Sequence, residues 1–460
     1  MQASAFSSLS LNSELVDNLK SLGFEAMTPI QEESLPAILS GKDLIGQAKT
    51  GSGKTAAFGL GVLNKLNVKF FRIQALILCP TRELADQVAQ EMRRLARAQH
   101  NIKILTLCGG KPIGPQIGSL EHGAHIIVGT PGRIEDHLRK GTLILANVNT
   151  LVLDEADRML EMGFQESLDA IIEHVPSRRQ TLLFSATYPN EISSIAERIM
   201  HNPEMVKIES THSAASIEQH VYRITSDEQR LLAVRLLLMQ FTPESALVFC
   251  NTKRETEDVA DLLASHGFSA KALHGDMEQR DRDQTLVQFS NKSLSVLVAT
   301  DVAARGLDIE ALDLVLNYQL ARDPEVHVHR VGRTGRAGRS GIACTLFSDR
   351  EAYKLERLED VTSLPETEAL PEKTLLNQTV PKAAMVTLQI EGGKKQKVRP
   401  GDILGALTGK GGVQGNTVGK INIFEQTAYV AVKREIANAA LTKLQQGKLK
   451  GRTHRVRLVK

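Results

Sequence analysis

The 460-residue sequence lacks long apolar runs, an amino-terminal targeting pattern and closely spaced cysteines. No run of about 18 apolar residues occurs, so we expect no membrane-spanning helix. The first fifteen residues do not show the basic stretch followed by an apolar one that marks a signal peptide. The cysteines Cys79, Cys108, Cys250 and Cys344 lie far apart and give no metal-ligand spacing. These absences predict a cytoplasmic globular protein with reduced core cysteines.

Charge is distributed unevenly along the chain. The net charge is only +3, but residues 382–460 contain sixteen Lys and Arg against four Asp and Glu, a net of +12. The remaining residues, 1–381, therefore carry a net charge of −9. A basic module beside an acidic body most often binds nucleic acid, although a merely solvated charged face would give the same count.

The octet "AKTGSGKT" at residues 48–55 departs from the phosphate-binding pattern G-x-x-x-x-G-K-[ST] only at its first position, Ala48. Gly51 and Gly53 permit close approach of the backbone to phosphate, Lys54 supplies a cation and Thr55 a hydroxyl for Mg²⁺. A short apolar strand precedes the octet and an apolar-striped helix follows it. We expect a nucleotide site; the alternative is a glycine-rich turn that happens to end in Lys-Thr.

Two segments of the acidic body resemble each other. Residues 75–92, "ALILCPTRELADQVAQEM", align with residues 246–263, "ALVFCNTKRETEDVADLL". Further apolar strands follow each copy in the same order and alternate with helices, which is typical of parallel sheets covered on both faces. The sequence thus predicts two tandem α/β domains, joined near the small polar residues 210–216.

Only the first of the two copies has a strand that ends in paired acids, "LVLDEAD" at residues 151–157. Asp154 is placed to hold Mg²⁺, and Glu155 to orient and deprotonate a water for attack on a γ phosphate. An acidic cluster after a strand can also be a plain helix N-cap. The phosphate-loop pattern in the same domain favours NTP hydrolysis.

The second copy lacks a phosphate loop but contains "HRVGRTGRAGR" at residues 329–339. Its guanidinium groups could neutralise a phosphoryl group in transfer, as arginine fingers do; a surface basic patch is the alternative. The finger role predicts that two domains close on one nucleotide. The arginines concerned recur every three residues: Arg330, Arg333, Arg336 and Arg339.

The ordered motifs of the chain resemble those of the DEAD-box RNA helicases. They are "AKTGSGKT", "PTRELA" (80–85), "GG" (109–110), "TPGR" (130–133), "DEAD" (154–157), "SAT" (185–187), "LVFCNT" (247–252), "ATDVAARGLDI" (299–309) and "HRVGRTGR" (329–336). In this family the phosphate loop regularly begins with alanine. The resemblance implies two tandem RecA-like domains, at residues 1–210 and 217–365, and ATP-dependent local unwinding of RNA.

The resemblance also implies an ATP site with Mg²⁺. "GFEAMTPIQ" (23–31) is similar to the family's adenine-reading motif, with Met27 in place of the usual proline, and no N-K-x-D guanine motif occurs. Gln31 would read the adenine edge, Phe6 would pack on its ring, and Asp308 would lie near the ribose. Lys54, Asp154, Glu155, Arg333 and Arg336 would be catalytic, and Thr55 and Asp154 would hold the metal. The phosphates would contact Ala48, Lys49, Thr50, Gly51, Ser52, Gly53, Lys54 and Thr55.

Two further sets of residues take roles from the resemblance. Ser185, Thr187 and Asp157 would couple hydrolysis to domain closure. A second set would hold the sugar-phosphate chain of RNA without reading its sequence. This RNA set comprises Arg82, Gly110, Thr130, Arg133, Thr252, Gly275, Gln279, Arg282 and Thr300.

Residues 382–460 show the order strand, helix, strand, strand, helix, strand of an RNA-recognition-motif fold, an α+β domain. The usual pair of base-stacking aromatics is missing, and Tyr429 in the third strand could either stack on a base or pack as a strand residue. "RPGDILGALTG" and "GKINIFEQTAYVAV" resemble the RNA-binding domain of bacterial DbpA-type DEAD-box proteins.

That branch implies a hairpin of large-subunit (23S) ribosomal RNA as target and a role in assembly of the large ribosomal subunit. We expect a monomer with ATP, Mg²⁺ and RNA as ligands, no membrane partner, and a linker near residues 365–381. The alternatives are a DEAD-box helicase of broader RNA specificity, an ATP-gated RNA clamp, and a passive RNA chaperone.

Overall fold

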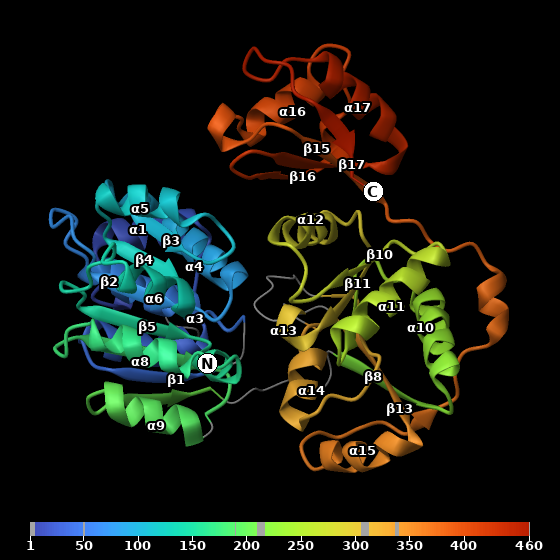
Figure 1. Ribbon diagram of the computed structural model, residues 1–460, viewed down its shortest axis with the longest axis horizontal. Helices are drawn as coiled ribbons and strands as arrows, with labels where there is room; N and C mark the ends of the chain where they lie inside the picture. Colours follow the sequence, from blue (N-terminus) through green and yellow to red (C-terminus); the bar gives the residue numbers. More distant parts are fainter. Residues whose placement is uncertain are drawn as a thin grey trace. The chain divides into compact units, whose positions relative to one another are not determined.

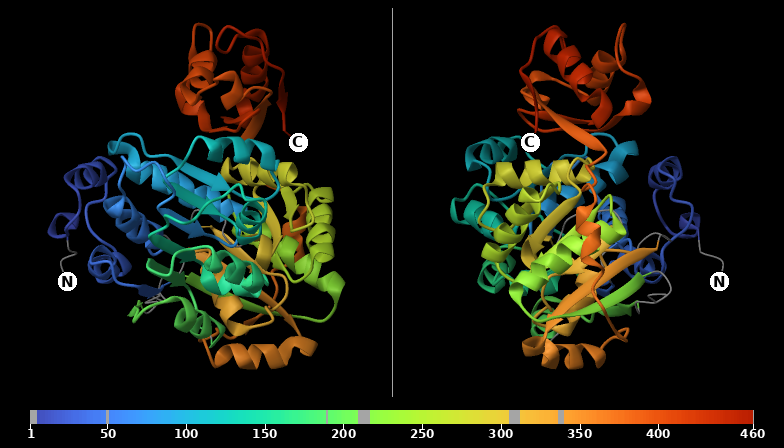
Figure 2. Two further views of the ribbon diagram at one scale, coloured as in Figure 1. Left: turned by 60° about the vertical axis from the view of Figure 1, so that its left-hand side comes forward. Right: turned by 90° about the vertical axis from the view of Figure 1, so that its right-hand side faces the viewer.

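The computed structural model describes residues 5–48, 51–188, 190–208, 217–304, 312–335 and 340–459. These residues separate into two compact units, the first formed by the amino-terminal half and the second by the rest. Helices cover both faces of the large sheet in each unit (Figures 1 and 2). The segments with assigned roles that fall outside the described residues are Lys49, Thr50, 210–216, Asp308, Arg336 and Arg339.

The first unit contains a seven-stranded sheet in the order β3-β4-β2-β5-β6-β1-β7. Every neighbouring pair in it is parallel. Every residue of the central strands β2, β4, β5 and β6 is buried, as expected for a parallel sheet covered on both faces. The strands are β1 (Leu44–Gln47), β2 (Ala75–Leu78), β3 (Ile104–Leu107), β4 (Ile126–Gly129), β5 (Thr150–Asp154), β6 (Gln180–Ser185) and β7 (Glu204–Lys207).

Two apolar clusters fill the two sides of this sheet. One contains residues of α1 (Ser13–Ser21), α2 (Pro29–Leu39), α3 (Lys54–Lys65) and α4 (Arg82–Leu95). The other contains residues of α6 (Pro131–Arg139), α7 (Ala156–Glu161), α8 (Gln165–Glu173) and α9 (Asn190–Ile199). The helix α5 (Ile113–Glu121) follows β3. Alternate residues of each strand enter opposite clusters, for example Leu76 and Ile77 of β2.

The large sheet of the second unit repeats this arrangement, with the order β10-β11-β9-β12-β13-β8-β14. The segment predicted as the second copy forms β9 and α11, which correspond to β2 and α4, and β11 and β12 correspond to β4 and β5. The expectation of two similar α/β sheets is confirmed. The strands are β8 (Ile217–Ile224), β9 (Ala246–Cys250), β10 (Ala270–Leu273), β11 (Val296–Thr300), β12 (Leu314–Asn317), β13 (Gly341–Ser348) and β14 (Thr367–Glu368).

The helices of this domain are α10 (Asp227–Phe241), α11 (Lys253–Ser265), α12 (Gln279–Ser290), α13 (Asp301–Ala304), α14 (Pro324–Val331) and α15 (Ala352–Glu359). Residues of α10 and α11 share an apolar cluster with alternate strand residues on one face of the sheet. A smaller cluster joins Leu358 of α15 to Leu320 and to Phe347 of β13.

The segment expected to be a linker packs against the second unit. β14 extends the sheet as a parallel neighbour of β8. Glu368 accepts hydrogen bonds from the ring of His220, at 2.8 Å, and from the hydroxyl of Tyr222, at 3.3 Å. Leu375 and Val380, farther along the segment, pack against the apolar cluster that contains residues of α10 and α11. We call residues 365–381 the strap, because β14 and the apolar contacts of Leu375 and Val380 hold this segment to the second domain.

Residues 385–458 form a four-stranded antiparallel sheet in the order β16-β17-β15-β18, with both helices packed on one face. This is the order of elements that the sequence predicts for an RNA-recognition motif. The elements are β15 (Met385–Ile390), α16 (Pro400–Thr408), β16 (Val418–Ile423), β17 (Ala428–Lys433), α17 (Ala437–Gln446) and β18 (Val456–Leu458).

The four cysteines are free thiols and buried, as predicted. Burial raises the pKa of the Cys108 thiol to about 12, so this side chain is an inert core residue at neutral pH. Within the described ranges, none of the helices combines the length and apolar character needed to cross a bilayer.

Candidate functional site

The phosphate loop lies between the end of β1 and the start of α3. Gly51 and Gly53 have φ of 82° and 98°, in the left-handed region where glycine is favoured. A Cβ on Gly53 would lie only 2.5 Å from Nε2 of Gln31. Ala48 does not have a positive φ; its N–H donates to the Ser185 carbonyl at 3.0 Å and the residue is buried. The backbone at the first position of the loop therefore does not require glycine.

Two side chains of the loop are placed to bind phosphate. Lys54 is buried, and its ammonium donates to the Ala48 carbonyl at 2.6 Å. The buried Oγ of Ser52 has no hydrogen-bond partner among the described residues, which is costly unless a ligand or water supplies one. α3 begins at Lys54, so the positive end of its dipole lies at the loop. These residues fit the phosphates of a nucleotide.

Two carboxylates follow β5 beside this loop. Asp154 is buried, and burial raises its pKa to about 7, although the charge of Lys54 opposes the rise. Glu155 has φ 53° and ψ 54°, an uncommon conformation for a residue with a side chain, of a kind that occurs often at functional sites. Among the described residues, no three His, Cys, Asp or Glu side chains are grouped to hold a metal by themselves. A cation here would need oxygens from a nucleotide or water as well.

The two residues expected at the adenine have other partners in this structure. The Gln31 amide lies on the phosphate loop, where Nε2 donates to the Gly53 carbonyl at 3.1 Å and Oε1 accepts from the Thr28 N–H at 2.9 Å. Phe6 is 4% exposed and packs edge-on against Phe24, with ring centroids 6.1 Å apart. Gln31 thus supports the loop, and Phe6 belongs to the apolar core.

The three residues expected to couple hydrolysis to closure lie together. Oδ2 of Asp157 accepts hydrogen bonds from the Ala186 N–H, from the Thr187 N–H and from the Thr187 hydroxyl, at 3.2, 2.9 and 2.9 Å. The Ser185 hydroxyl accepts from the Asp157 N–H at 3.4 Å. The end of β6 is thus tied to the first turn of α7, directly after Glu155.

The expected RNA residues of the first unit follow three adjacent strands of its sheet, β2, β4 and β3. The Arg82 guanidinium lies against the Gly109–Gly110 turn, where a Cβ on Gly110 would be 1.7 Å from Nη1 of Arg82. Thr130 is the N-cap residue of α6, and Arg133 donates to the Lys111 carbonyl at 3.0 Å. Because carboxyl ends of parallel strands share one sheet edge, these residues lie on the same edge as the phosphate loop, but along different strands.

The expected RNA residues of the second unit repeat this placement after β9, β10 and β11. Thr252 caps α11 by accepting from the Glu255 N–H at 3.2 Å, and Thr300 ends β11. Arg282 of α12 donates to the His274 carbonyl at 3.0 Å. The two remaining members are Gly275 and Gln279, in the turn after β10 and at the start of α12.

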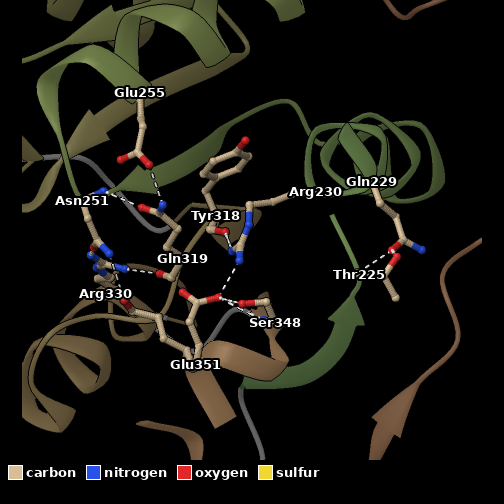
Figure 3. Close-up of polar contacts among 11 residues, drawn as sticks. Thr225, Gln229, Arg230, Asn251, Glu255, Tyr318, Gln319, Arg330, Ser348 and Glu351 are labelled. Atoms are coloured by element: carbon tan, nitrogen blue, oxygen red, sulfur yellow. Dashed lines mark hydrogen bonds and ion pairs between the residues drawn. The ribbon is translucent and has the colours of Figure 1, made fainter. Parts of the chain in front are cut away.

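Arg330 is a structural residue, which corrects its inclusion among arginines that could reach a phosphoryl group. It is 1% exposed and pairs with both oxygens of Asp301, at 2.7 Å each. It also donates to the Gln319 carbonyl and to Asn251, both at 2.8 Å (Figure 3). A buried charge needs such partners, so the periodic arginine pattern in the sequence mixes a core residue with arginines that are expected at the nucleotide.

The Arg330 network connects the segments that carry the expected RNA and finger residues of the second unit. Asp301 directly follows Thr300, and Asn251 directly precedes Thr252. Arg333, which is 7% exposed, lies three residues after Arg330. A second buried arginine, Arg230, pairs with Glu351 nearby (Figure 3). No sequence pattern marks the Asp301 partner, because the two residues lie 29 positions apart.

The sheet of the carboxyl-terminal domain contacts α12 within the second unit. Val287 of α12 forms a buried cluster with Tyr429 and Val459. Tyr429 is 3% exposed, so the packed alternative for this residue is the one the structure shows. Thr387 contacts Ser293 at 2.7 Å and Asn291 at 3.3 Å through its hydroxyl. At Thr387 and Tyr429, the sheet face that would stack bases is therefore covered by α12 and the residues that follow it.

We expect the substitution Val287→Asp to detach the carboxyl-terminal domain from α12, because a carboxylate would replace a buried apolar side chain that contributes about 1.5–3 kcal/mol. Residual dipolar couplings or small-angle scattering of the full chain should then show two independently oriented domains. Val361→Asp, at a valine that is 54% exposed, is the matched control. Unchanged domain orientation in the Val287→Asp protein would contradict the contact.

Three family models match the chain. The DEAD/DEAH box helicase model covers residues 28–195 and the helicase conserved C-terminal domain covers residues 228–338. The DbpA RNA binding domain covers residues 387–458. The chain is 54% identical to the ATP-dependent RNA helicase DbpA of Escherichia coli, over 99% of this chain and 100% of that protein.

Other relatives share the first two domains. The DEAD-box ATP-dependent RNA helicase CshA of Geobacillus kaustophilus is 46% identical, over 78% of this chain and 76% of that protein. Saccharomyces cerevisiae Dbp5 bound to RNA and ADP BeF3 has a TM-score of 0.70 at 30% identity, covering 80% of this chain and 96% of that one. Mss116p bound to ssRNA and AMP-PNP has a TM-score of 0.72 at 28% identity, covering 81% of each chain. From the phosphate loop to the carboxyl-terminal RNA-binding domain, this chain belongs to the DEAD-box ATP-dependent RNA helicases, in the DbpA branch.

Proposed function

We propose that this helicase separates short RNA duplexes near a hairpin of 23S ribosomal RNA, during assembly of the large ribosomal subunit. The observation that carries the proposal is the 54% identity to DbpA over the full length, including the carboxyl-terminal RNA-binding domain. The net charge of +12 in residues 382–460 supports RNA as the partner of that domain.

The chemistry proposed for the ATP site uses the residues around the phosphate loop. Lys54, Ser52 and the N–H groups of the loop bind the phosphates, and Asp154 with Thr55 would hold Mg²⁺, which would add positive charge at the phosphates. Glu155 orients the attacking water and accepts its proton. A proton on Asp154 would compete with the metal, because burial raises its pKa to about 7.

Residues of the second unit complete the proposed reaction. Arg333, together with Arg336, which lies outside the described residues, would neutralise the developing charge on the γ phosphate. This role requires the two helicase domains to meet on one nucleotide during the cycle. We propose that ATP drives such closure and that closure on bent RNA separates the strands locally, through backbone contacts that are blind to sequence.

Thr187 is proposed to transmit closure, since its hydroxyl bonds to the carboxylate of Asp157, two residues after Glu155. In Thr187→Val, we expect ATP hydrolysis within about threefold of the normal rate, while strand separation falls about tenfold or more. RNA-stimulated ATPase and duplex-displacement rates measure the two effects. Thr187→Ser keeps the hydroxyl and should restore unwinding. Parallel loss of both activities in Thr187→Val would place Thr187 in hydrolysis itself.

The proposed target is tested by ATPase and strand displacement with three RNAs of equal length: a 23S hairpin with a flanking duplex, an unrelated hairpin duplex and a single strand. We expect the ribosomal hairpin to give half-maximal stimulation of the ATPase at a concentration at least about tenfold lower than either of the other two RNAs. Equal stimulation by all three would support a helicase of broader specificity. ATP-dependent RNA retention without displacement would support an RNA clamp, and displacement without ATP would support a passive chaperone.

A further inference from the structure

A small hollow in the second unit is lined by residues at the start of α14 and by residues of α15. These two helices pack against each other (Figure 1). Leu320 and Leu358 are among its apolar lining residues, and Arg322, Lys354 and Arg357 are its basic ones. Its enclosed part has a volume of about 10 Å³, room for about one water-sized group, and the hollow opens to solvent. None of these residues takes part in the ATP site, in the expected RNA set or in the contact with the carboxyl-terminal domain.

One of the lining residues is a buried histidine. His327 lines the hollow and is 1% exposed, and neither of its ring nitrogens has a hydrogen-bond partner within the described part of the chain. Burial, together with the nearby charge of Arg330, lowers the pKa of this imidazole to about 3. The neutral ring presents one N–H donor and one acceptor nitrogen. Leaving both unmet costs about 1–3 kcal/mol per group, so a polar ligand that reaches the ring would gain this energy.

The charges around the hollow favour an anion. Among the described residues, neither Arg322, Lys354 nor Arg357 forms an ion pair. Asp323 is the only acid among the lining residues, which leaves a net charge of +2 for the lining with His327 neutral. Asp323 is also the N-cap residue of α14, but its side chain makes no capping hydrogen bond. The first turn of the helix therefore adds partial positive charge at the same place.

We propose that this hollow binds a phosphate group, at a site separate from the phosphate loop. The phosphate would pair with Arg322, Lys354 and Arg357, and one of its oxygens would accept from the His327 ring. A protonated phosphate oxygen or a bound water would donate to the other ring nitrogen. Two sources offer this chemistry, free phosphate and the backbone phosphate of an RNA strand. α14 leads directly to Arg330 and Arg333, so a ligand at its amino-terminal end acts on the helix that positions these residues.

The full-length protein, labelled with ¹⁵N in histidine and saturated with ADP at its nucleotide site, allows a local test. We expect inorganic phosphate, and not chloride at equal ionic strength, to shift the ring signals of His327 in a saturable way. His327→Gln assigns the signals by their loss. The double substitution Arg322→Gln and Arg357→Gln should raise the apparent Kd for phosphate at least tenfold. Arg350→Gln, at an exposed arginine outside the hollow, should leave it unchanged.

A second titration distinguishes the two sources. If a single-stranded RNA moves the same signals and phosphate competes with it, RNA backbone is the ligand; if only phosphate moves them, the ligand is a free phosphate. The proposal is overturned if neither produces a saturable shift, which would leave water alone in the hollow, or if the double arginine variant binds phosphate as tightly as the unchanged protein. If the His327→Gln protein fails to fold, the variant with Arg322→Gln and Arg357→Gln still tests phosphate binding, because both of these arginines are exposed.

Discussion

Replacing Glu155 with glutamine should lower the rate of ATP hydrolysis by about a hundredfold or more while ATP still binds. Glutamine has nearly the same size and can keep the place of a side chain that is 9% exposed, but it cannot accept a proton from the attacking water. Because the nucleotide then persists, the protein should remain on RNA in the ATP state. Single-turnover hydrolysis, fluorescent-nucleotide affinity and the dissociation rate of labelled RNA measure the three effects.

Glu161→Gln is the matched control for this experiment. Glu161 ends the same short helix, α7, and its side chain is 53% exposed and accepts from the buried Arg158. The glutamine amide oxygen can still accept this hydrogen bond, so the substitution should leave hydrolysis nearly unchanged. The role of Glu155 is contradicted if the Glu155→Gln protein hydrolyses ATP at close to the normal rate. Loss of ATP affinity in proportion to the loss of rate would instead point to damage at the phosphate loop.

Removing residues 382–460 should produce an ATPase that needs at least about tenfold more RNA for half-maximal stimulation and that no longer prefers the ribosomal hairpin. Residues 1–381 carry a net charge of −9, so their own attraction to polyanionic RNA is weak. In the intact chain the strap and the contact with α12 hold the basic domain against the helix that also contains Gln279 and Arg282. Truncation therefore removes both the high local concentration of the hairpin near the helicase domains and its fixed position beside them.

The truncated protein should also carry Val287→Ser, since Val287 would otherwise become an exposed apolar residue on α12. ATPase titrations with a ribosomal hairpin fragment and with an unrelated RNA of equal length compare the two proteins, and unstimulated ATPase controls for folding. The isolated domain should bind the hairpin with an affinity that falls as salt rises. Retention of the same preference at the same RNA concentrations by the truncated protein would locate specificity in the helicase domains.

Local sequence patterns determined the elements and the chemistry of the ATP site. The strand, loop and helix around residues 48–55 follow from an apolar run, glycines with permissive φ and a lysine at a helix start, all within one short segment. The duplicated strand and helix at residues 75–92 and 246–263 likewise predicted two similar sheets. Such features are determined by neighbours in the sequence, so they can be predicted without knowledge of long-range contacts.

Tertiary contacts decided which members of these patterns face a ligand and which form the core. Arg330 follows the same three-residue spacing as Arg333, yet its pairing with Asp301 across 29 residues makes it a structural group. Tyr429 occupies a base-stacking position of its strand, but Val287, 142 positions earlier in the chain, covers it. The strap reads as a polar linker and instead extends the sheet beside β8. In each case a partner distant in sequence satisfies a buried charge, an apolar face or a strand edge, and no local pattern specifies such a partner.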